Sequence, residues 1–249
     1  MTAAELALFL GAGIVGGMVN SLAGGAKLFV FPLLLASGLP PIVANATGTV
    51  ALWPAQLPAV WINRHRIAGQ GGALLRRMWP ALIGALIGAG LLIVASERAF
   101  LAAIPFVLVA AVGIIALGNR TATLSARFLP TRYRDVAAKM LIFATGIYGG
   151  FFGAGMGFLL IAVLTLAGVA SIQSANTEKN VLSTAINTTA VVPLLLSGLV
   201  HLPAAIVVLL GGLAGGYLGG MLAGRLPETP MRVGIALLGM LLTLSFLFS

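Results

Sequence analysis

The sequence predicts an all-α integral membrane protein made of two inverted five-segment repeats with short broken or tilted helices, about ten transmembrane segments in all. Three observations predict it: the apolar composition, the hydrophobic runs, and a glycine–asparagine pattern that occurs once in each half. Of the 249 residues, 60% are hydrophobic and 8% are charged, whereas a soluble domain carries roughly 25% charged residues. No polar stretch is long enough to form a soluble catalytic domain. We therefore expect a membrane protein that is not an enzyme.

The hydrophobic runs define ten segments, five on either side of one polar connector. They cover residues 4–22, 26–37, 43–62, 73–95 and 99–118 in the first half, and residues 137–153, 157–169, 175–197, 202–224 and 230–248 in the second. A helix needs about 20 apolar residues to cross the hydrocarbon core, so the second segment of each half must be tilted, deformed or re-entrant. We divide the chain into a first transmembrane repeat (1–119), a cytoplasmic connector (120–136) and a second transmembrane repeat (137–249).

The basic residues favour one orientation for these segments. Four arginines between residues 64 and 77 follow the third segment, and a second basic cluster occupies the connector. Because short loops rich in lysine and arginine face the cytoplasm, both regions should lie on that side, with both termini outside. An odd number of crossings per half then inverts the second repeat. If the short segments only dip into the membrane, Arg225 and Arg232 move outside, so the charges favour ten crossings.

Loops also account for the net charge of +9. Because the basic residues sit between apolar spans, we expect attraction to anionic lipid headgroups and no nucleic-acid partner. The chain has no cysteine, which excludes disulfides and thiolate metal sites. Nothing in the sequence indicates a cofactor or a metal, and it leaves open whether the chain acts alone or as a homodimer.

Two interrupted hydrophobic segments are the most informative motifs. A glycine-rich break leads through a short apolar stretch to an asparagine in each half: Gly16-Gly17-Met18-Val19-Asn20-Ser21-Leu22-Ala23-Gly24-Gly25 to Ala44-Asn45-Ala46-Thr47, and Gly149-Gly150-Phe151-Phe152-Gly153-Ala154-Gly155-Met156-Gly157 to Ala175-Asn176-Thr177-Glu178-Lys179-Asn180. Irregular polar backbone survives at membrane depth only where it lines a cavity or is buried in protein. A repeated pair of such segments therefore predicts a transporter's binding site.

The fourth segments carry a second repeated pattern. Gly84 and Gly88 match Gly211 and Gly215, a spacing of small residues that lets two membrane helices approach closely. We interpret these glycines as packing positions.

The asparagines of the motifs admit two interpretations. Asn45 and Asn176 each follow a short helix and a turn, where asparagine caps the next helix. The same geometry would offer two helix amino ends to an anion at the middle of the bilayer. Further polar residues recur on one helical face, which indicates either substrate contact or hydrogen bonding within the bundle. The candidate substrate-binding residues are Asn20, Ser21, Gly24, Gly25, Asn45, Thr47, Gly153, Gly155, Asn176, Lys179, Asn180 and Asn187.

Lys179 is the strongest single candidate. A charge at membrane depth costs about 3 kcal/mol on insertion scales, so it normally faces a cavity or a partner. We interpret Lys179 as the counter-charge of an anion, with Glu178 as its ion-pair partner or a proton carrier. The alternatives are a structural pair or a side chain that reaches the interface. Lys27 has a weaker case because its counterpart in the second half is apolar.

The two glycine–asparagine motifs, together with Leu39-Pro40-Pro41, resemble those of the TauE/SafE family of sulfite exporters over nearly the whole chain. The resemblance implies movement of sulfite, sulfonates or related organosulfur anions across the bacterial inner membrane, usually outward. Lys27 departs from the run of small residues that the resemblance leads us to expect after the first glycine motif, which puts the substrate in question.

Our hypothesis is a secondary transporter of a small anion, in which one repeat rocks against the other around the site. A permease for a metal cation is an alternative, although it should carry several buried carboxylates, and Glu178 is the one carboxylate expected in the core. An intramembrane enzyme is a further alternative. It would need a nucleophile beside a base, and neither His65 nor His201 is well placed for that role.

Overall fold

The computed structural model describes residues 2–22, 24–106, 130–169 and 171–222, together with the isolated positions 109, 113, 237 and 240. Within these residues the chain is helical and has no strand. The α-helices are α1 (Ala3–Leu22), α2 (Lys27–Ala36), α3 (Pro41–Leu52), α4 (Leu57–Asn63), α5 (Gly71–Val94), α7 (Thr131–Phe151), α8 (Met156–Leu166), α9 (Ile172–Leu196) and α10 (Leu202–Leu222). Two short 3-10 helices, η1 (Trp53–Gln56) and η2 (Arg64–Ile67), flank α4.

The described helices follow the hydrophobic runs closely. The third run is divided into α3, η1 and α4, because Pro54 and Pro58 cannot donate the backbone hydrogen bonds of a continuous helix. Helix α7 begins at Thr131, before the predicted start at 137. The fifth run is helical over 97–106, and its remainder, like most of the tenth run, lies outside the described residues.

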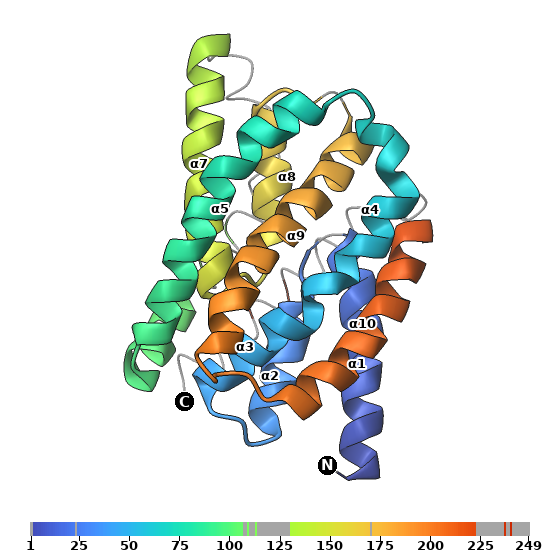
Figure 1. The fold of residues 1–249 in the computed structure, drawn as a ribbon, viewed down its shortest axis with the longest axis vertical. Coiled ribbons are helices and arrows are strands. Elements are labelled where there is room, and N and C mark those ends of the chain that lie inside the picture. The colour runs from blue at the N-terminus through green and yellow to red at the C-terminus, as the bar shows by residue number, and fades with distance from the viewer. Residues whose placement is uncertain are drawn as a thin grey trace.

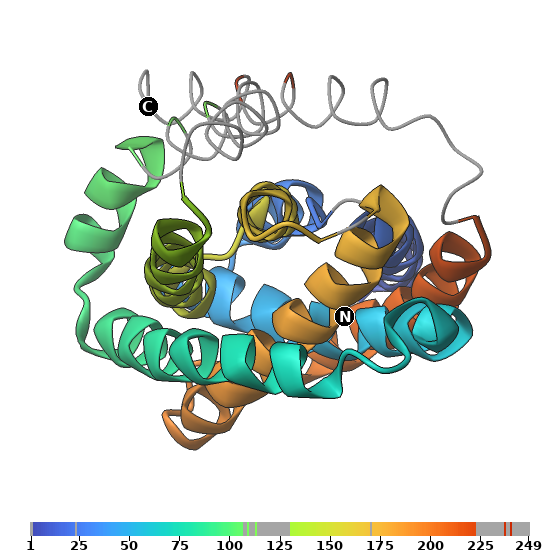
Figure 2. The ribbon, with the colours of Figure 1, turned by 90° about the horizontal axis from the view of Figure 1, so that it is seen from above.

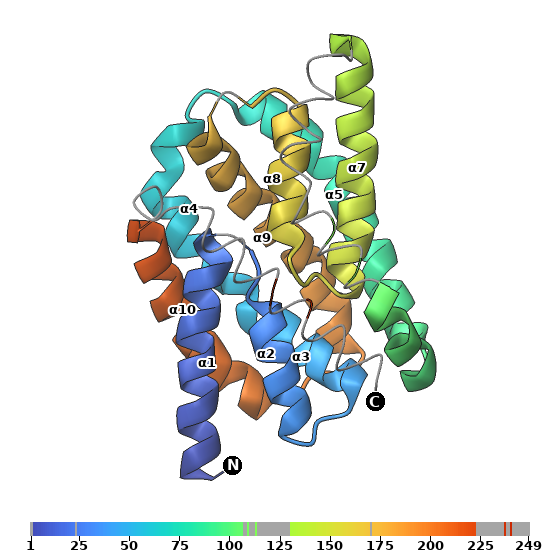
Figure 3. The ribbon, with the colours of Figure 1, turned by 180° about the vertical axis from the view of Figure 1, so that it is seen from behind.

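The short helices α2 and α8 turn back from the interior. They contain 10 and 11 residues, or roughly 15 Å at 1.5 Å per residue, about half of the ~30 Å hydrocarbon core. Each forms a hairpin with the helix before it, so that α2 ends near the N-terminus and α8 ends near the start of α7 (Figures 1 and 3). Among the described residues, three helices are long and apolar enough to cross a membrane: α1, α5 and α10. Ten full crossings therefore remain a prediction.

The connections lie at two ends of the molecule. The α4–α5 connection, the α8–α9 connection and the start of α7 lie at one end, whereas the N-terminus and the α2–α3 and α9–α10 loops lie at the other (Figure 1). We call the first of these the basic end, because it carries Arg64, Arg66 and the two arginines of the first turns of α5. These positions agree with the sidedness that the charge distribution predicts.

The polar side chains lie inside and many large apolar side chains lie outside. On α5, Trp79, Ile83, Leu86 and Leu91 are exposed, whereas most of the asparagines, threonines and lysines of the repeated motifs are buried. A soluble protein rarely exposes so large an apolar surface. The distribution suits a protein that is surrounded by lipid.

Glycine seams join helices from opposite halves of the chain. Figure 2 shows α5 beside α7 on one side of the short helices α2 and α8, and α1 beside α10 on the other. A Cβ atom on Gly84 or Gly88 would collide with a backbone carbonyl of α7, and one on Gly211 or Gly215 would collide with a carbonyl of α1. The packing role predicted for these four glycines is confirmed.

The seam makes a direct prediction for stability. Gly88→Ala should destabilise the folded protein by about 1–3 kcal/mol, because the added Cβ meets the Ile147 carbonyl oxygen and forces the α5 and α7 backbones apart. Gly90→Ala is the matched control, since nothing lies within 4 Å of the Cβ it adds. Thermal unfolding in detergent measures both. Equal unfolding temperatures for the two variants would contradict the close contact.

Candidate functional site

A small polar cavity lies between the two interrupted segments. Its volume is about 20 Å³, room for about one water molecule. Four glycines bring backbone to its wall, and Gly24 of the first half packs directly on Gly157 of the second. The polar side chains on its wall are Asn20, Lys27, Thr49, Gln56, Ser183 and Asn187, and the remaining lining residues are Gly24, Gly48, Leu52, Gly153, Met156 and Gly157.

Two turns position the glycine backbone at this cavity. Gly24 has a φ of 85° and lies between α1 and α2, and Gly153 has a φ of 77° and lies between α7 and α8. Residues with a Cβ rarely adopt this left-handed conformation, whereas glycine adopts it freely. The turns place the amino ends of α2 and α8 at the cavity, through Lys27, Met156 and Gly157. The positive ends of two helix dipoles therefore lie at this site.

The sequence predicts that the helices beginning at Asn45 and Asn176 have their amino ends at the site, but in the structure the amino ends at the cavity are those of α2 and α8. Helix α3 begins after Pro40, and α9 begins after Ser171, whose Oγ accepts a hydrogen bond from the Ser174 N–H. Asn45 and Asn176 therefore lie inside their helices, and the capping role considered for them is wrong. The helices start earlier than the hydrophobic runs because Pro41 and the polar residues before Asn176 extend them.

Two buried lysines reach from one half of the chain to the other. The Nζ of Lys27 donates to the Thr49 hydroxyl at 2.5 Å and to the Phe152 carbonyl of the second half. The Nζ of Lys179 donates to the carbonyl oxygens of Asn20 at 3.1 Å and Ser21 at 3.3 Å in the first half. Lys27 is 7% exposed and Lys179 is fully buried.

Asparagine amides make the same kind of cross-half contact. Asn45 Nδ2 donates to the Phe151 carbonyl at 2.8 Å, and Asn180 Nδ2 donates to the Ser21 carbonyl at 3.0 Å. Asn176 Nδ2 lies 3.5 Å from the same Ser21 oxygen. The last carbonyls of a helix have no donor within the helix, so the polar residues of each half satisfy the end of the first helix of the other half.

The structure separates the predicted site residues into two groups. Asn20, Gly24, Gly153 and Asn187 line the cavity. The others lie behind its wall: Lys179, Asn45, Asn176 and Asn180 bind backbone carbonyls, Thr47 accepts from the His201 N–H, Ser21 Oγ donates to carbonyls within α1, and Gly25 and Gly155 are buried in the two turns.

Four polar residues on the wall were not among the predicted site residues, and Lys27 is one of them. Thr49 and Gln56 follow Asn45 along the third segment, and Ser183 lies on the polar face of α9. Gln56 Oε1 and Ser183 Oγ are buried and have no hydrogen-bond partner. The equivalence of the two halves could have identified Gln56 from the sequence. Gln56 and Asn187 occupy matching positions after Asn45 and Asn176.

Glu178 pairs with a residue other than the one the sequence indicated. Its Oε1 lies 2.5 Å from Nη1 of Arg77, which belongs to α5, and Glu178 is 1% exposed. Lys179, the partner expected from the sequence, points instead to the end of α1. Glu178 and Lys179 have different partners because adjacent residues on a helix do not face each other.

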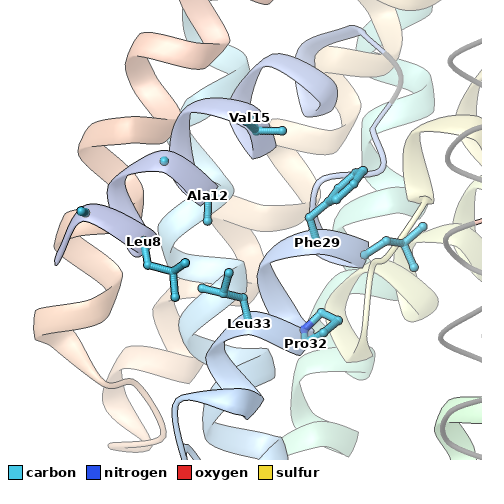
Figure 4. Close-up of a pocket in the computed structure, with 9 residues that line it drawn as sticks. Leu8, Ala12, Val15, Phe29, Pro32 and Leu33 are labelled. Atoms are coloured by element: carbon cyan, nitrogen blue, oxygen red, sulfur yellow. The ribbon is translucent and has the colours of Figure 1, made fainter. Parts of the chain in front are cut away.

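A larger opening lies on the surface between α1 and α2 (Figure 4). It has a volume of about 500 Å³, and its lining side chains, Leu8, Val15, Phe29 and Leu33 among them, are all apolar. A small anion needs hydrogen-bond donors, which this lining does not supply. The smaller central cavity is therefore the candidate site.

Comparisons with known proteins identify one family and two related membrane transporters. A family model described as "Sulfite exporter TauE/SafE" matches residues 9–246. A "Probable membrane transporter protein" of Haemophilus influenzae is 26% identical over 98% of this chain and 94% of its own length. A "Probable membrane transporter protein ORF9" of Sinorhizobium sp. is 27% identical over 66% of this chain and 62% of its own length. No solved structure matches the chain.

Proposed function

Because the chain belongs to the sulfite exporter TauE/SafE family, we propose that it is a secondary transporter that carries sulfite or a small organosulfonate or oxyanion across the bacterial inner membrane by alternating access. The observation that carries the proposal is the electropositive cavity. Lys27 on its wall and Lys179 behind Asn20 are hydrogen-bonded to neutral oxygens, and neither forms an ion pair within the described residues. Buried charges are ordinarily paired, so these ammonium groups suit an anionic substrate.

The proposal includes two repeats of opposite orientation. The two glycine seams, α1 with α10 and α5 with α7, support the opposite orientation. In both, the first helix of one half packs on the fourth helix of the other. The cavity supports it as well. Gly24 and Gly153, Leu52 and Ser183, and Gln56 and Asn187 hold matching positions in the two halves, and both members of each pair lie on this wall. A two-fold axis between inverted repeats is where transporters of this construction bind their substrates.

The cavity has to enlarge before a substrate enters. Space for one water does not hold a sulfur atom with three oxygens, so the substrate does not fit the described arrangement. We propose that cross-half bonds open in turn on the two sides of the cavity. This movement would expose the residues now behind the wall, namely Ser21, Gly25, Asn45, Thr47, Gly155, Asn176, Lys179 and Asn180, to the substrate.

The membrane potential is sufficient to drive export. A doubly charged anion that leaves a negative-inside cell gains about 4.6 kcal/mol per 100 mV. A uniporter would then suffice, without a coupled proton.

A flux panel in proteoliposomes tests the proposed function. We expect purified protein to move sulfite and at least one of sulfoacetate and thiosulfate, and not divalent metal ions. Empty liposomes and liposomes with heat-denatured protein are the controls. Transport of a metal ion without any anion would overturn the proposal in favour of a cation permease.

A further inference from the structure

The two buried lysines do not hold matching positions in the repeats. When Asn45 is matched with Asn176, the residue that corresponds to Lys179 is Gly48. When Gly24 is matched with Gly153, the residue that corresponds to Lys27 is Met156, the first residue of α8. The sequence therefore gives each half one lysine, at unrelated points of its repeat.

Their ammonium groups nevertheless reach matching places. Lys179 binds the carbonyls at the end of α1, and Lys27 binds the Phe152 carbonyl at the end of α7, the first helix of the other half. Gly48 explains how this occurs. A Cβ at Gly48 would lie 3.7 Å from Cε of Lys27, so the Lys27 side chain passes over the position from which a lysine matching Lys179 would start.

When both lysines are protonated, the centre of the protein carries an excess of two positive charges. The one buried carboxylate among the described residues, that of Glu178, is paired with Arg77. Carbonyl and hydroxyl oxygens solvate an ammonium group only in part, and removing an ion from water costs several kcal/mol. An anion with two charges would balance both ammonium groups, whereas a singly charged anion would leave one uncompensated.

The wall also offers a donor that is not in use. Ser183 Oγ is buried, has no partner and lies on the same cavity as Lys27. Its hydroxyl is free to donate to an oxyanion oxygen. The cavity therefore offers such a group a hydrogen-bond donor as well as the positive charge of Lys27.

Resting on the proposed function, we propose that Lys27 supplies the second of two ammonium groups at the substrate site, in the place that Lys179 holds in the other half, and that this pair selects doubly charged oxyanions over singly charged ones. The anion competes with the Phe152 carbonyl for the Lys27 ammonium group. Binding therefore loosens a contact between the halves.

Relocating the charge tests the proposal. The proteins are wild type, Lys27→Leu, Lys27→Arg, and the double variant Lys27→Leu/Gly48→Lys, which moves the ammonium group to the position that matches Lys179. Sulfite at neutral pH, where a large part of it carries two charges, is compared with methanesulfonate, which carries one. Flux is measured in proteoliposomes, and binding is measured by thermal stabilisation of the detergent-solubilised protein.

We expect Lys27→Leu to weaken sulfite binding about 30-fold, the factor that corresponds to 2 kcal/mol for one lost partner of a buried charge pair. Methanesulfonate should lose much less. The double variant should recover the preference for sulfite. Lys27→Arg keeps the charge and should retain the preference, so it provides the test if the double variant does not fold.

The binding measurement separates this inference from the proposed function. If sulfite stabilises wild type but not Lys27→Leu, the lysine site is supported, whether or not flux is found. Absence of flux would count against transport alone. Sulfite flux with the same preference over methanesulfonate in wild type and Lys27→Leu overturns the lysine site and leaves transport intact. Absence of stabilisation by sulfite in wild type also overturns it.

Discussion

Replacing Arg77 with methionine is expected to destabilise the folded protein by about 3–5 kcal/mol, because it leaves the buried Glu178 carboxylate without its counter-charge. The Glu178 side chain is 2% exposed and its Oε2 already lacks a partner. Thermal or denaturant-induced unfolding in detergent, followed by circular dichroism, measures the effect.

Arg76→Met is the matched control for this variant, since Arg76 is the preceding residue on α5 and is exposed. It should change stability by less than about 0.5 kcal/mol. Adding Glu178→Gln to Arg77→Met should recover most of the loss, because the uncompensated charge is removed with its partner. A double variant no more stable than Arg77→Met would show that the pair is not the source of the effect.

Replacing Lys179 with methionine is expected to reduce anion flux at least about tenfold, equivalent to 1.4 kcal/mol. Methionine retains most of the apolar stem but removes the donor to the Asn20 and Ser21 carbonyls and one positive charge at the site. Initial sulfite flux in proteoliposomes, normalised to folded protein, is the measurement.

Lys139→Met serves as the control, because Lys139 is a partly exposed lysine of α7 that pairs with exposed Asp135. Its flux should equal that of wild type, since exposed ion pairs contribute little. Undiminished flux in Lys179→Met would remove Lys179 from the transport mechanism.

The parts of the fold that depend on local pattern could be predicted from the sequence. Hydrophobic runs locate the helices, and the spacing of Gly84 and Gly88 identifies a close helix contact, because only residues without a side chain permit it. The glycine breaks locate the turns at the cavity. In each case the physical cause lies within a few neighbouring residues.

The partners of the polar side chains could not be predicted in the same way. Lys179 and Asn20, or Glu178 and Arg77, are brought together only when distant helices pack. Residue type shows that each needs a partner, but not which one. The place of Lys27 does not follow from a comparison of the two halves, because its counterpart is apolar and its flexible stem passes over Gly48 to reach the end of α7.

The glycine seams constrain which parts of the protein move. Each seam holds a helix of one half against a helix of the other, backbone against backbone, so whole-repeat rocking would have to break two close contacts between the halves. We expect the seams instead to act as a stationary frame. The short hairpin helices α2 and α8, whose amino ends meet at the cavity, would then be the gates that hinge within it.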